Sequence, residues 1–176
     1  KNAFDATLGT GRLYLFDHFG STSIENIVNR VRYLAKGMSC KYVFLDHLSI
    51  IISSQESGDE RKALDEVMTK LRMLVQETNI ALILVSHLKR PSDKGHEEGA
   101  ATSLAQLRGS ASIAQLSDMV IGLERNGQAE DLIERNTTHV RVLKNRYSGI
   151  TGPACHLLYN KETGRMFQTE VEQDVL

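Results

Sequence analysis

Two segments in the first half of the chain carry the hydrophobic spacing of helices. Apolar residues recur every three or four positions over 24–35, which predicts a helix that opens at the capping-box pattern Thr22–Glu25 and ends at Gly37. The same spacing follows a second capping-box pattern, Ser57–Glu60, and predicts a helix that reaches about Glu77. Each predicted helix has one apolar face, so each is expected to cover another layer of structure.

Short apolar runs separate these helices and predict strands at 12–17, 41–46 and 80–86. The third run is wholly apolar, as expected for a strand that is covered on both faces. Because strands that alternate with helices form βαβ units, the pattern predicts an α/β fold with a mostly parallel sheet flanked by helices. No internal boundary interrupts the pattern, and residues 1–176 are expected to belong to one domain.

The second half of the chain has a different pattern. Between Leu88 and Ala101 the periodicity breaks into a polar loop with one Pro and two Gly, which is long enough to expect a function. Two later strands flank the turn SGITGP and are predicted to pair as a C-terminal β-hairpin. The elements predicted in this half are a helix around 110–117 and strands at 118–124, 139–146, 155–160 and 165–168.

The composition is that of an ordinary globular chain, because 41% of the 176 residues are hydrophobic and 24% are charged. The net charge of −1 gives no overall sign of nucleic-acid binding, so such a partner must be argued from local positions. The two cysteines have no metal-ligand spacing, which fits a reducing compartment. No apolar run is long enough to span a bilayer, so we expect a cytoplasmic protein with no membrane partner.

Three of the predicted strands end in polar pairs, Asp17-His18, Asp46-His47 and Ser86-His87. In open parallel sheets, ligands bind beyond the carboxyl ends of the strands. A carboxylate that holds an ion through water, beside a neutral polar group that contacts a terminal phosphate, suits a nucleotide–Mg²⁺ site. The alternative is that these residues only cap the turns after the strands, and the spacing alone leaves both interpretations open.

A series of motifs makes the interpretation specific. The chain resembles the helicase half of phage primase–helicases and the related mitochondrial Twinkle helicase, within the DnaB-like group of RecA-fold ring motors. The resemblance covers about residues 12–167 and implies a partial RecA-like P-loop NTPase core. The motifs that carry it are FLDHLS at 44–49, VSHLKRP at 85–91, HEEG at 96–99, LRGSASIAQLSD at 107–118, LERN at 123–126, LKNRYSG at 143–149 and NKETG at 160–164.

The resemblance implies an ATP-dependent (or dTTP-dependent) replicative DNA helicase that uses Mg²⁺. Its implied partners are single-stranded DNA and identical subunits in a hexameric ring, and it leaves open a primase domain in the same chain. The phosphate-binding pattern G-x-x-x-x-G-K-[ST] is absent from these residues, as is the catalytic-base Glu that follows it in the family. We therefore expect both to lie upstream, and we expect this chain alone to be catalytically inactive.

The resemblance also assigns roles around the nucleotide. Asp46 matches the acid that holds Mg²⁺ through water, and His87 matches the histidine that touches the γ-phosphate. Gln115 matches a glutamine beside the same phosphate, although an exposed helix Gln is its alternative. Arg146 resembles the arginine finger that reaches a neighbouring subunit's nucleotide. Lys144 lies two residues earlier, on the same face of the strand. It could assist Arg146 in the finger role or take that role in its place.

Two further residues, Arg125 and Tyr159, match positions that sandwich the adenine in the family. Tyr159 could equally be part of the core.

Basic residues in the long loop and at its return are the candidates for DNA binding. They are Lys89, Arg90, Lys94, Arg108 and Gly109, which could hold phosphates through side chains and backbone N–H groups. Acidic residues in the same loop leave it close to neutral, so a solvated loop is the alternative for Arg90 and Lys94. Lys89 and Arg108 lie inside matched motifs and are the stronger candidates.

Three other functions remain open from the sequence. A recombinase-type ATPase would coat DNA without unwinding it. A metal-dependent hydrolase could use the Asp-His pairs with His87 and His96, although adjacent Asp and His side chains point to opposite faces of a strand. The chain could also act only as a folded interaction module.

Overall fold

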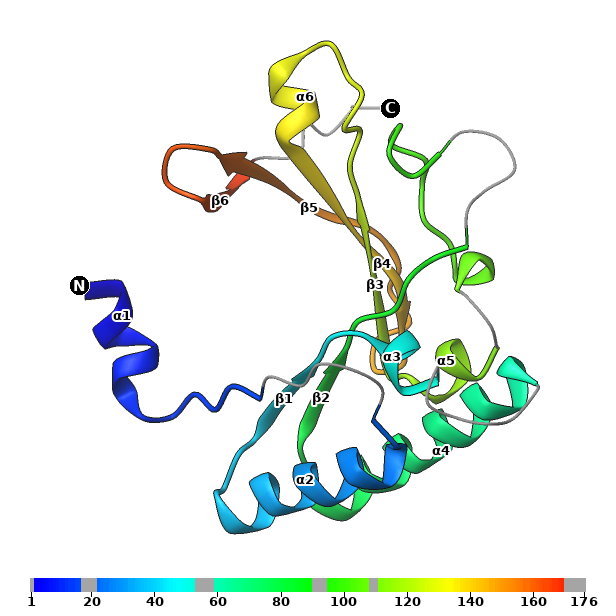
Figure 1. Ribbon diagram of the computed structural model, residues 1–176. Helices are drawn as coiled ribbons and strands as arrows, with labels where there is room; N and C mark the ends of the chain where they lie inside the picture. The colour runs from blue at the N-terminus through cyan, green and yellow to red at the C-terminus, as the bar shows by residue number, and fades with distance from the viewer. Residues whose placement is uncertain (1, 17–21, 53–58, 90–94, 108–110, 170–176) are drawn as a thin grey trace.

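The computed structural model describes residues 2–16, 22–52, 59–89, 95–107 and 111–169, and Figure 1 shows the arrangement of their elements. The helices are α1 (Asn2–Ala6), α2 (Ile24–Gly37), α3 (Leu48–Ile52), α4 (Glu60–Thr78), α5 (Ala111–Leu116) and α6 (Leu132–Asn136), with 3-10 turns η1 (Leu8–Thr10) and η2 (Leu104–Gln106). The strands are β1 (Tyr42–Leu45), β2 (Ala81–Leu84), β3 (Met119–Glu124), β4 (Thr137–Asn145), β5 (Gly152–Asn160) and β6 (Arg165–Thr169). Among the described residues, no helix is long and apolar enough to cross a membrane.

The α/β half of the molecule is built on β1 and β2, which pair in parallel with Tyr42 opposite Ala81 and Leu45 opposite Leu84. Figure 1 shows α2 and α4 side by side along one face of this pair. The apolar stripes predicted from the sequence form the core between them. Its most deeply buried members include Ile24, Ile51, Leu64, Val67, Leu71 and Leu74. Each such side chain contributes on the order of 2 kcal/mol when it is removed from water.

Both long helices are present, but each begins at a different cap from the one predicted. The N-cap of α2 is Ser23, whose hydroxyl accepts a hydrogen bond from Asn26 N, rather than Thr22. The N-cap of α4 is Asp59, whose carboxylate accepts from two backbone N–H groups of the first turn. The cap predicted at Thr22 is therefore wrong, because a nearer short polar side chain satisfies a free N–H group. Ser57, which opens the second predicted box, lies outside the described residues.

Among the described residues, none covers the opposite face of β1 and β2. Val43, Leu45, Leu82 and Leu84 pack against the helical core. The alternate side chains are exposed, at 72% for Tyr42, 75% for Phe44 and 38% for Ile83. Because successive residues of a strand point to opposite faces, these exposed apolar side chains share one face of the parallel pair. The wholly apolar run of β2 predicts that both faces of the strand are covered. Among the described residues, only the face toward α2 and α4 is covered.

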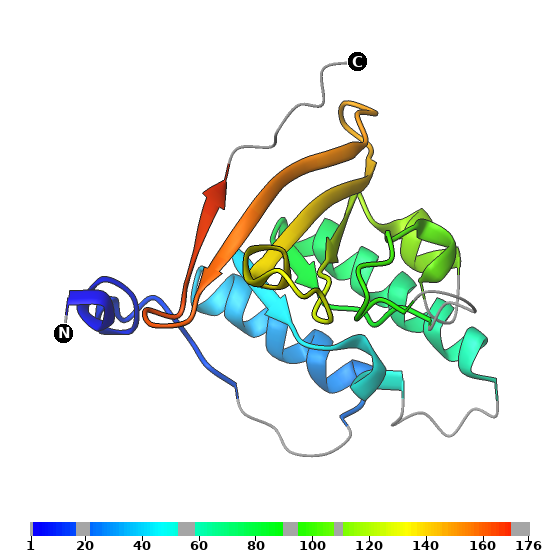
Figure 2. The ribbon, with the colours of Figure 1, turned by 90° about the horizontal axis from the view of Figure 1, so that it is seen from above.

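The second sheet has four strands in the order β3–β4–β5–β6, and all of its neighbours are antiparallel. Figure 2 shows β4 and β5 as a long twisted pair. The predicted hairpin is confirmed, and β6 extends it. The prediction of a mostly parallel sheet is wrong for the described residues, because the parallel sheet has only two strands and β3 pairs antiparallel with β4. The polar region before β4 also contains α6, which was not predicted.

The strand predicted at 12–17 is absent over its described part. Residues 12–16 are exposed and have no regular structure, and Asp17 lies outside the described residues. The side chain of Phe16 instead lies beneath the guanidinium of Arg30 on α2, 4.0 Å from ring centroid to Cζ. The apolar run is therefore present without a described strand beside it, and a strand needs such pairing for its backbone hydrogen bonds.

Candidate functional site

The carboxyl ends of β1 and β2 meet at one rim of the parallel sheet. Val85 N donates to Leu45 O at 3.0 Å, and Leu48 N donates to Val85 O at 3.0 Å, so the two chains stay paired beyond the strand ends. The ring centroids of His47 and His87 lie 4.4 Å apart in a T-shaped contact. The predicted convergence of these two strand tips is therefore present in the structure.

Asp46 stands at this rim with its side chain 77% exposed, and its Oδ1 lies 3.6 Å from His47 Nδ1. The burial alternation of β1 continues past the end of the strand, so Asp46 is on the uncovered face with Phe44. His87 is likewise exposed, at the alternate position that follows Ile83 and Val85. A carboxylate and an imidazole are thus presented at one edge of an uncovered sheet face. Asp17 and His18, which the sequence places at a third strand tip, lie outside the described residues.

A second group of predicted residues meets at the C-terminal end of α5. Lys144 Nζ donates to Ala114 O at 2.6 Å, Ser117 O at 2.8 Å and Gln115 O at 3.3 Å. Carbonyls at the end of a helix lack partners within the helix, and an ammonium group there also complements the helix dipole. Lys144 therefore caps α5, while the Gln115 side chain is exposed.

Arg146 follows β4 directly and docks on the same end of α5. Its Nη2 donates to Gln115 O at 2.7 Å, and its Nη1 lies 3.0 Å from Asp118 Oδ1. The other carboxylate oxygen of Asp118 accepts from Arg72 Nη1 of α4 at 2.6 Å. Asp118 therefore bridges two arginines from different parts of the chain, a contact that the sequence analysis did not foresee.

The two predicted adenine-contacting residues lie in the antiparallel sheet. Arg125 is exposed just after β3, and its Nε donates to Arg135 O of α6 at 2.8 Å. Tyr159 is half-buried in β5, opposite Met166 of β6. No hydrogen bond or cation–π contact joins Arg125 and Tyr159, both of which are described, so their pairing around an adenine stays a prediction.

Lys89 is the one DNA-binding candidate that falls within the described ranges 59–89 and 95–107. Its backbone N–H donates to Gln106 O at 2.7 Å, and its carbonyl lies 3.1 Å from His96 Nε2. These contacts fix the backbone of Lys89 and leave its side chain exposed. Arg90, Lys94, Arg108 and Gly109 lie outside the described residues.

Glu124 is a buried acid that the sequence analysis missed. Its side chain is 6% exposed, and Oε1 accepts from Thr102 N at 2.7 Å, Thr102 Oγ1 at 2.8 Å and Arg141 Nε at 2.7 Å. Burial alone would raise the pKa of Glu124, but the hydrogen bonds from Arg141 and Thr102 outweigh it and lower the pKa. Gly122 allows this close approach, because a Cβ there would lie 2.0 Å from Thr102 Oγ1.

Glu124 thereby ties segment 95–107 to the end of β3. Two further contacts reinforce this attachment, a bridge between Glu98 and Asn126 and a hydrogen bond from Gly127 N to Glu97 O at 2.8 Å. Segment 95–107 holds Lys89, and Glu124 immediately precedes Arg125. The network therefore connects a DNA-binding candidate with a nucleotide-binding candidate. The alternation of β3 is the signal that could have found it, because Val120, Gly122 and Glu124 share one face of the strand.

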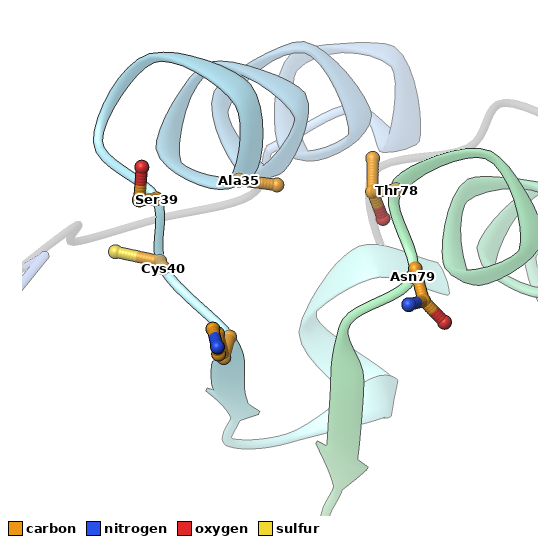
Figure 3. Close-up of a pocket in the computed structure, with 6 residues that line it drawn as sticks. Ala35, Ser39, Cys40, Thr78 and Asn79 are labelled. Atoms are coloured by element: carbon orange, nitrogen blue, oxygen red, sulfur yellow. The ribbon is translucent and has the colours of Figure 1, made fainter.

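A pocket at the opposite rim of β1 and β2 is not the candidate site. It is lined by residues at the ends of α2 and α4 and the starts of the strands, as Figure 3 shows for its labelled members. Ligands of parallel sheets bind beyond the carboxyl ends of the strands, whereas this pocket lies beside their amino ends. The lining residues are Ala35, Ser39, Cys40, Lys41, Thr78 and Asn79.

The metal-hydrolase alternative gains no support from the part of the chain that the structure describes. Within that part, no group of three or more His, Cys, Asp or Glu side chains is placed to hold a metal ion. The role of Asp46 beside a nucleotide-bound Mg²⁺ ion stays a prediction.

Comparison with known proteins places this geometry in a family. The sequence model of the DnaB-like helicase C-terminal domain matches residues 4–168. The DNA helicase/primase of Enterobacteria phage T3 is 41% identical over 162 residues, which cover 92% of this chain and 28% of that protein. A probable plasmid replicative DNA helicase of Chlamydia psittaci is 26% identical over 82% of this chain and 31% of that protein. The chain thus spans about a third or less of the length of these relatives.

Two solved structures share the fold. A DnaB-like replicative helicase, described with its interactions with primase, superposes with a TM-score of 0.70 at 22% identity, over 88% of this chain and 37% of that one. A KaiC-like protein from Pyrococcus horikoshii superposes with a TM-score of 0.64 at 17% identity, over 95% of this chain and 64% of that one. The fold is therefore RecA-like, in agreement with the sequence prediction. From the sequence match over residues 4–168, the chain belongs to the DnaB-like helicase C-terminal domain family.

Proposed function

We propose that this chain is the C-terminal part of the motor domain of an ATP-driven replicative DNA helicase, which moves along single-stranded DNA as a hexameric ring of identical subunits. The observation that carries the proposal is the exposed pair of Asp46 and His87 at adjacent tips of parallel strands, in a chain of this family. Nucleotide-dependent ring motors need an acid and a polar phosphate contact at that rim.

Asp46 would hold Mg²⁺ through water, and its exposed carboxylate fits that role because Mg²⁺ keeps most of its waters in nucleotide sites. The ion, bound with ATP or dTTP, would neutralise charge that develops on the transferred phosphate. His87 would contact the terminal phosphate from the neighbouring strand. Arg125 and Tyr159 would contact the adenine, and Gln115 would contact the terminal phosphate.

The uncovered face of β1 and β2 supports a further element of the proposal. Contiguous exposed apolar side chains such as Tyr42 and Phe44 mark surfaces that another segment covers. In the full-length parent, we place the segment that carries the phosphate-binding loop on this face, next to Asp46 and His87. That loop supplies the backbone N–H groups and the lysine that hold the phosphates, so this chain alone should not hydrolyse ATP.

Segment 95–107 and its flanks would face the DNA. Lys89 has a fixed backbone and a free side chain, which suits a phosphate contact. Arg90, Lys94, Arg108 and Gly109 would add contacts of the same kind. Six copies of these modest contacts around a ring would hold one strand more tightly than any one subunit could. The helicase/primase relative favours a primase domain in the same parent chain.

Strand displacement by the full-length parent on a forked DNA substrate tests the proposed function. Unwinding that needs both ATP and Mg²⁺ is the expected result. DNA-stimulated hydrolysis without unwinding would instead favour the recombinase-type ATPase.

Replacing Asp46 by asparagine in the parent is expected to lower hydrolysis about 10- to 100-fold, the usual cost of changing a group that acts on a metal through its outer shell. Raising the Mg²⁺ concentration should recover part of the loss, because the neutral amide weakens the ion's site without removing the nucleotide. Steady-state turnover as a function of Mg²⁺ concentration measures both effects. Asp5→Asn, an exposed acid on α1, is the control and should behave like the wild type. An unchanged Mg²⁺ dependence in Asp46→Asn would remove the metal role.

Replacing Lys89 by alanine in the parent should weaken single-stranded DNA binding and reduce the slope of log K against log salt by roughly 0.7, as for one lost phosphate contact on a single strand. Fluorescence anisotropy over a salt series measures both quantities. Lys161→Ala, in the turn between β5 and β6, removes the same charge elsewhere and should change neither. If Lys89→Ala binds DNA as the wild type does, segment 95–107 holds Lys89 for structural reasons alone.

A further inference from the structure

Arg146 is held on its own subunit by three separate contacts. Its Nη1 pairs with Asp118 Oδ1 at 3.0 Å, its Nη2 donates to Gln115 O at 2.7 Å, and its backbone N–H donates to Asp118 O at 2.8 Å. The side chain is nevertheless 44% exposed. Both terminal nitrogens of the guanidinium are therefore engaged, at a surface position from which the side chain can move.

The acid that receives Arg146 is itself held in place. Asp118 lies between α5 and β3, and its Oδ2 accepts from Arg72 Nη1 of α4 at 2.6 Å. This contact directs one carboxylate oxygen toward α4 and leaves Oδ1 for Arg146. Lys144 Nζ meanwhile caps the neighbouring carbonyls of Ala114 and Ser117. The docking position is therefore built from groups that have other contacts besides Arg146.

Each terminal nitrogen of the Arg146 guanidinium is bonded to its own subunit, so the side chain must break both contacts before it can extend to a phosphate in the next subunit. We propose that Asp118 is a positioning residue that retains Arg146 on its own subunit, and that engagement of a neighbouring nucleotide requires Arg146 to leave Asp118 and the Gln115 carbonyl. This inference rests on the proposed role of Arg146 as the arginine finger. A partly exposed ion pair is weak enough to open readily, so retention limits turnover without preventing it.

The test compares nucleotide turnover of the full-length parent with and without single-stranded DNA. Asp118→Asn removes the charge that retains Arg146, and basal turnover should rise about two- to fivefold at unchanged KM. Turnover with DNA should change less, because the finger is already engaged there, so the stimulation ratio falls. Asp118→Ser is a second removal variant with the same expected result if the asparagine variant does not fold. Asp118→Glu keeps the carboxylate and should stay near the wild type.

Glu77→Gln provides a matched control, because Glu77 is also a carboxylate between two cations, 2.9 Å from Arg32 and 2.5 Å from Lys36, at the C-terminal end of α4. It should leave the stimulation ratio unchanged. Comparing Asp118→Asn with Arg146→Ala separates the finger assignment of Arg146 from its retention by Asp118. If Arg146→Ala alone keeps normal turnover, the finger assignment fails and this inference fails with it. If Arg146→Ala is inactive but basal turnover is unchanged or lower in Asp118→Asn, the finger stands and retention by Asp118 is overturned.

Discussion

Replacing Arg146 by alanine in the full-length parent is expected to abolish nucleotide hydrolysis while nucleotide binding stays near its wild-type level. A finger arginine stabilises charge that develops on the phosphates in the transition state, and such groups contribute about 10³-fold or more to turnover. Binding of the ground-state nucleotide depends on other groups. Steady-state hydrolysis and equilibrium titration with a fluorescent nucleotide measure the two properties separately.

Two variants sharpen this experiment. Arg165→Ala, an exposed arginine at the start of β6, tests whether loss of any positive charge from this sheet has the same effect, and it should not. Lys144→Ala removes a group that binds three carbonyls at the C-terminal end of α5 and just after it, so it should lower thermal stability as well as turnover. Preserved hydrolysis in Arg146→Ala would remove the finger assignment.

The sequence predicted the elements that carry a clear hydrophobic pattern. The helices α2 and α4 and the strands β1 and β2 were recovered within a few residues, because hydrophobic periodicity records which face is buried. The antiparallel pairing of β3 was missed, since periodicity says nothing about which strand lies alongside or in which direction. The strand predicted at 12–17 failed for a related reason, because its apolar run can form a strand only where a partner edge is present.

The sequence predicted individual candidate residues of the site, but it did not predict the contacts that these residues make with one another. The spacing placed Asp46 and His87 at strand tips, and the structure brings those tips together. The same spacing could not show that Lys144 and Arg146 both turn back onto α5, since that contact depends on how β4 packs against a helix far away in sequence. Glu124 was missed because the exposed side chains of β3 are its apolar ones, Met119, Ile121 and Leu123, while the charged residue is buried.

Replacing Glu124 by alanine is expected to lower the free energy of unfolding of this chain by about 3 kcal/mol, toward the lower end for a broken buried pair. The loss leaves the guanidinium of Arg141 and two donors of Thr102 without their acceptor. Arg141 remains 31% exposed and regains some water, which limits the cost. Urea unfolding measures the total, and amide hydrogen exchange over segment 95–107 measures whether that segment detaches first.

Glu124→Gln separates the charge from the hydrogen bonds of this network. Its amide oxygen can still accept from Thr102, but it offers Arg141 no negative partner, so an intermediate loss of stability is expected. Glu162→Ala, in the exposed turn before β6, is the surface control. If Glu124→Ala unfolds as the wild type does, the buried pair contributes nothing and segment 95–107 is held by its other contacts.

The pH dependence of Glu124→Ala provides an independent check on the same pair. The folded pKa of Glu124 lies below its ordinary value of 4.5, so the folded state binds fewer protons than the unfolded state near that pH. The stabilisation is therefore complete above pH 4.5 and is lost as the pH falls through the lowered pKa. The difference in unfolding free energy between wild type and Glu124→Ala should accordingly be constant near neutrality and shrink below pH 4.5. A difference that grew on acidification would mean that Glu124 is protonated in the native network, and that Arg141 is not its charge partner.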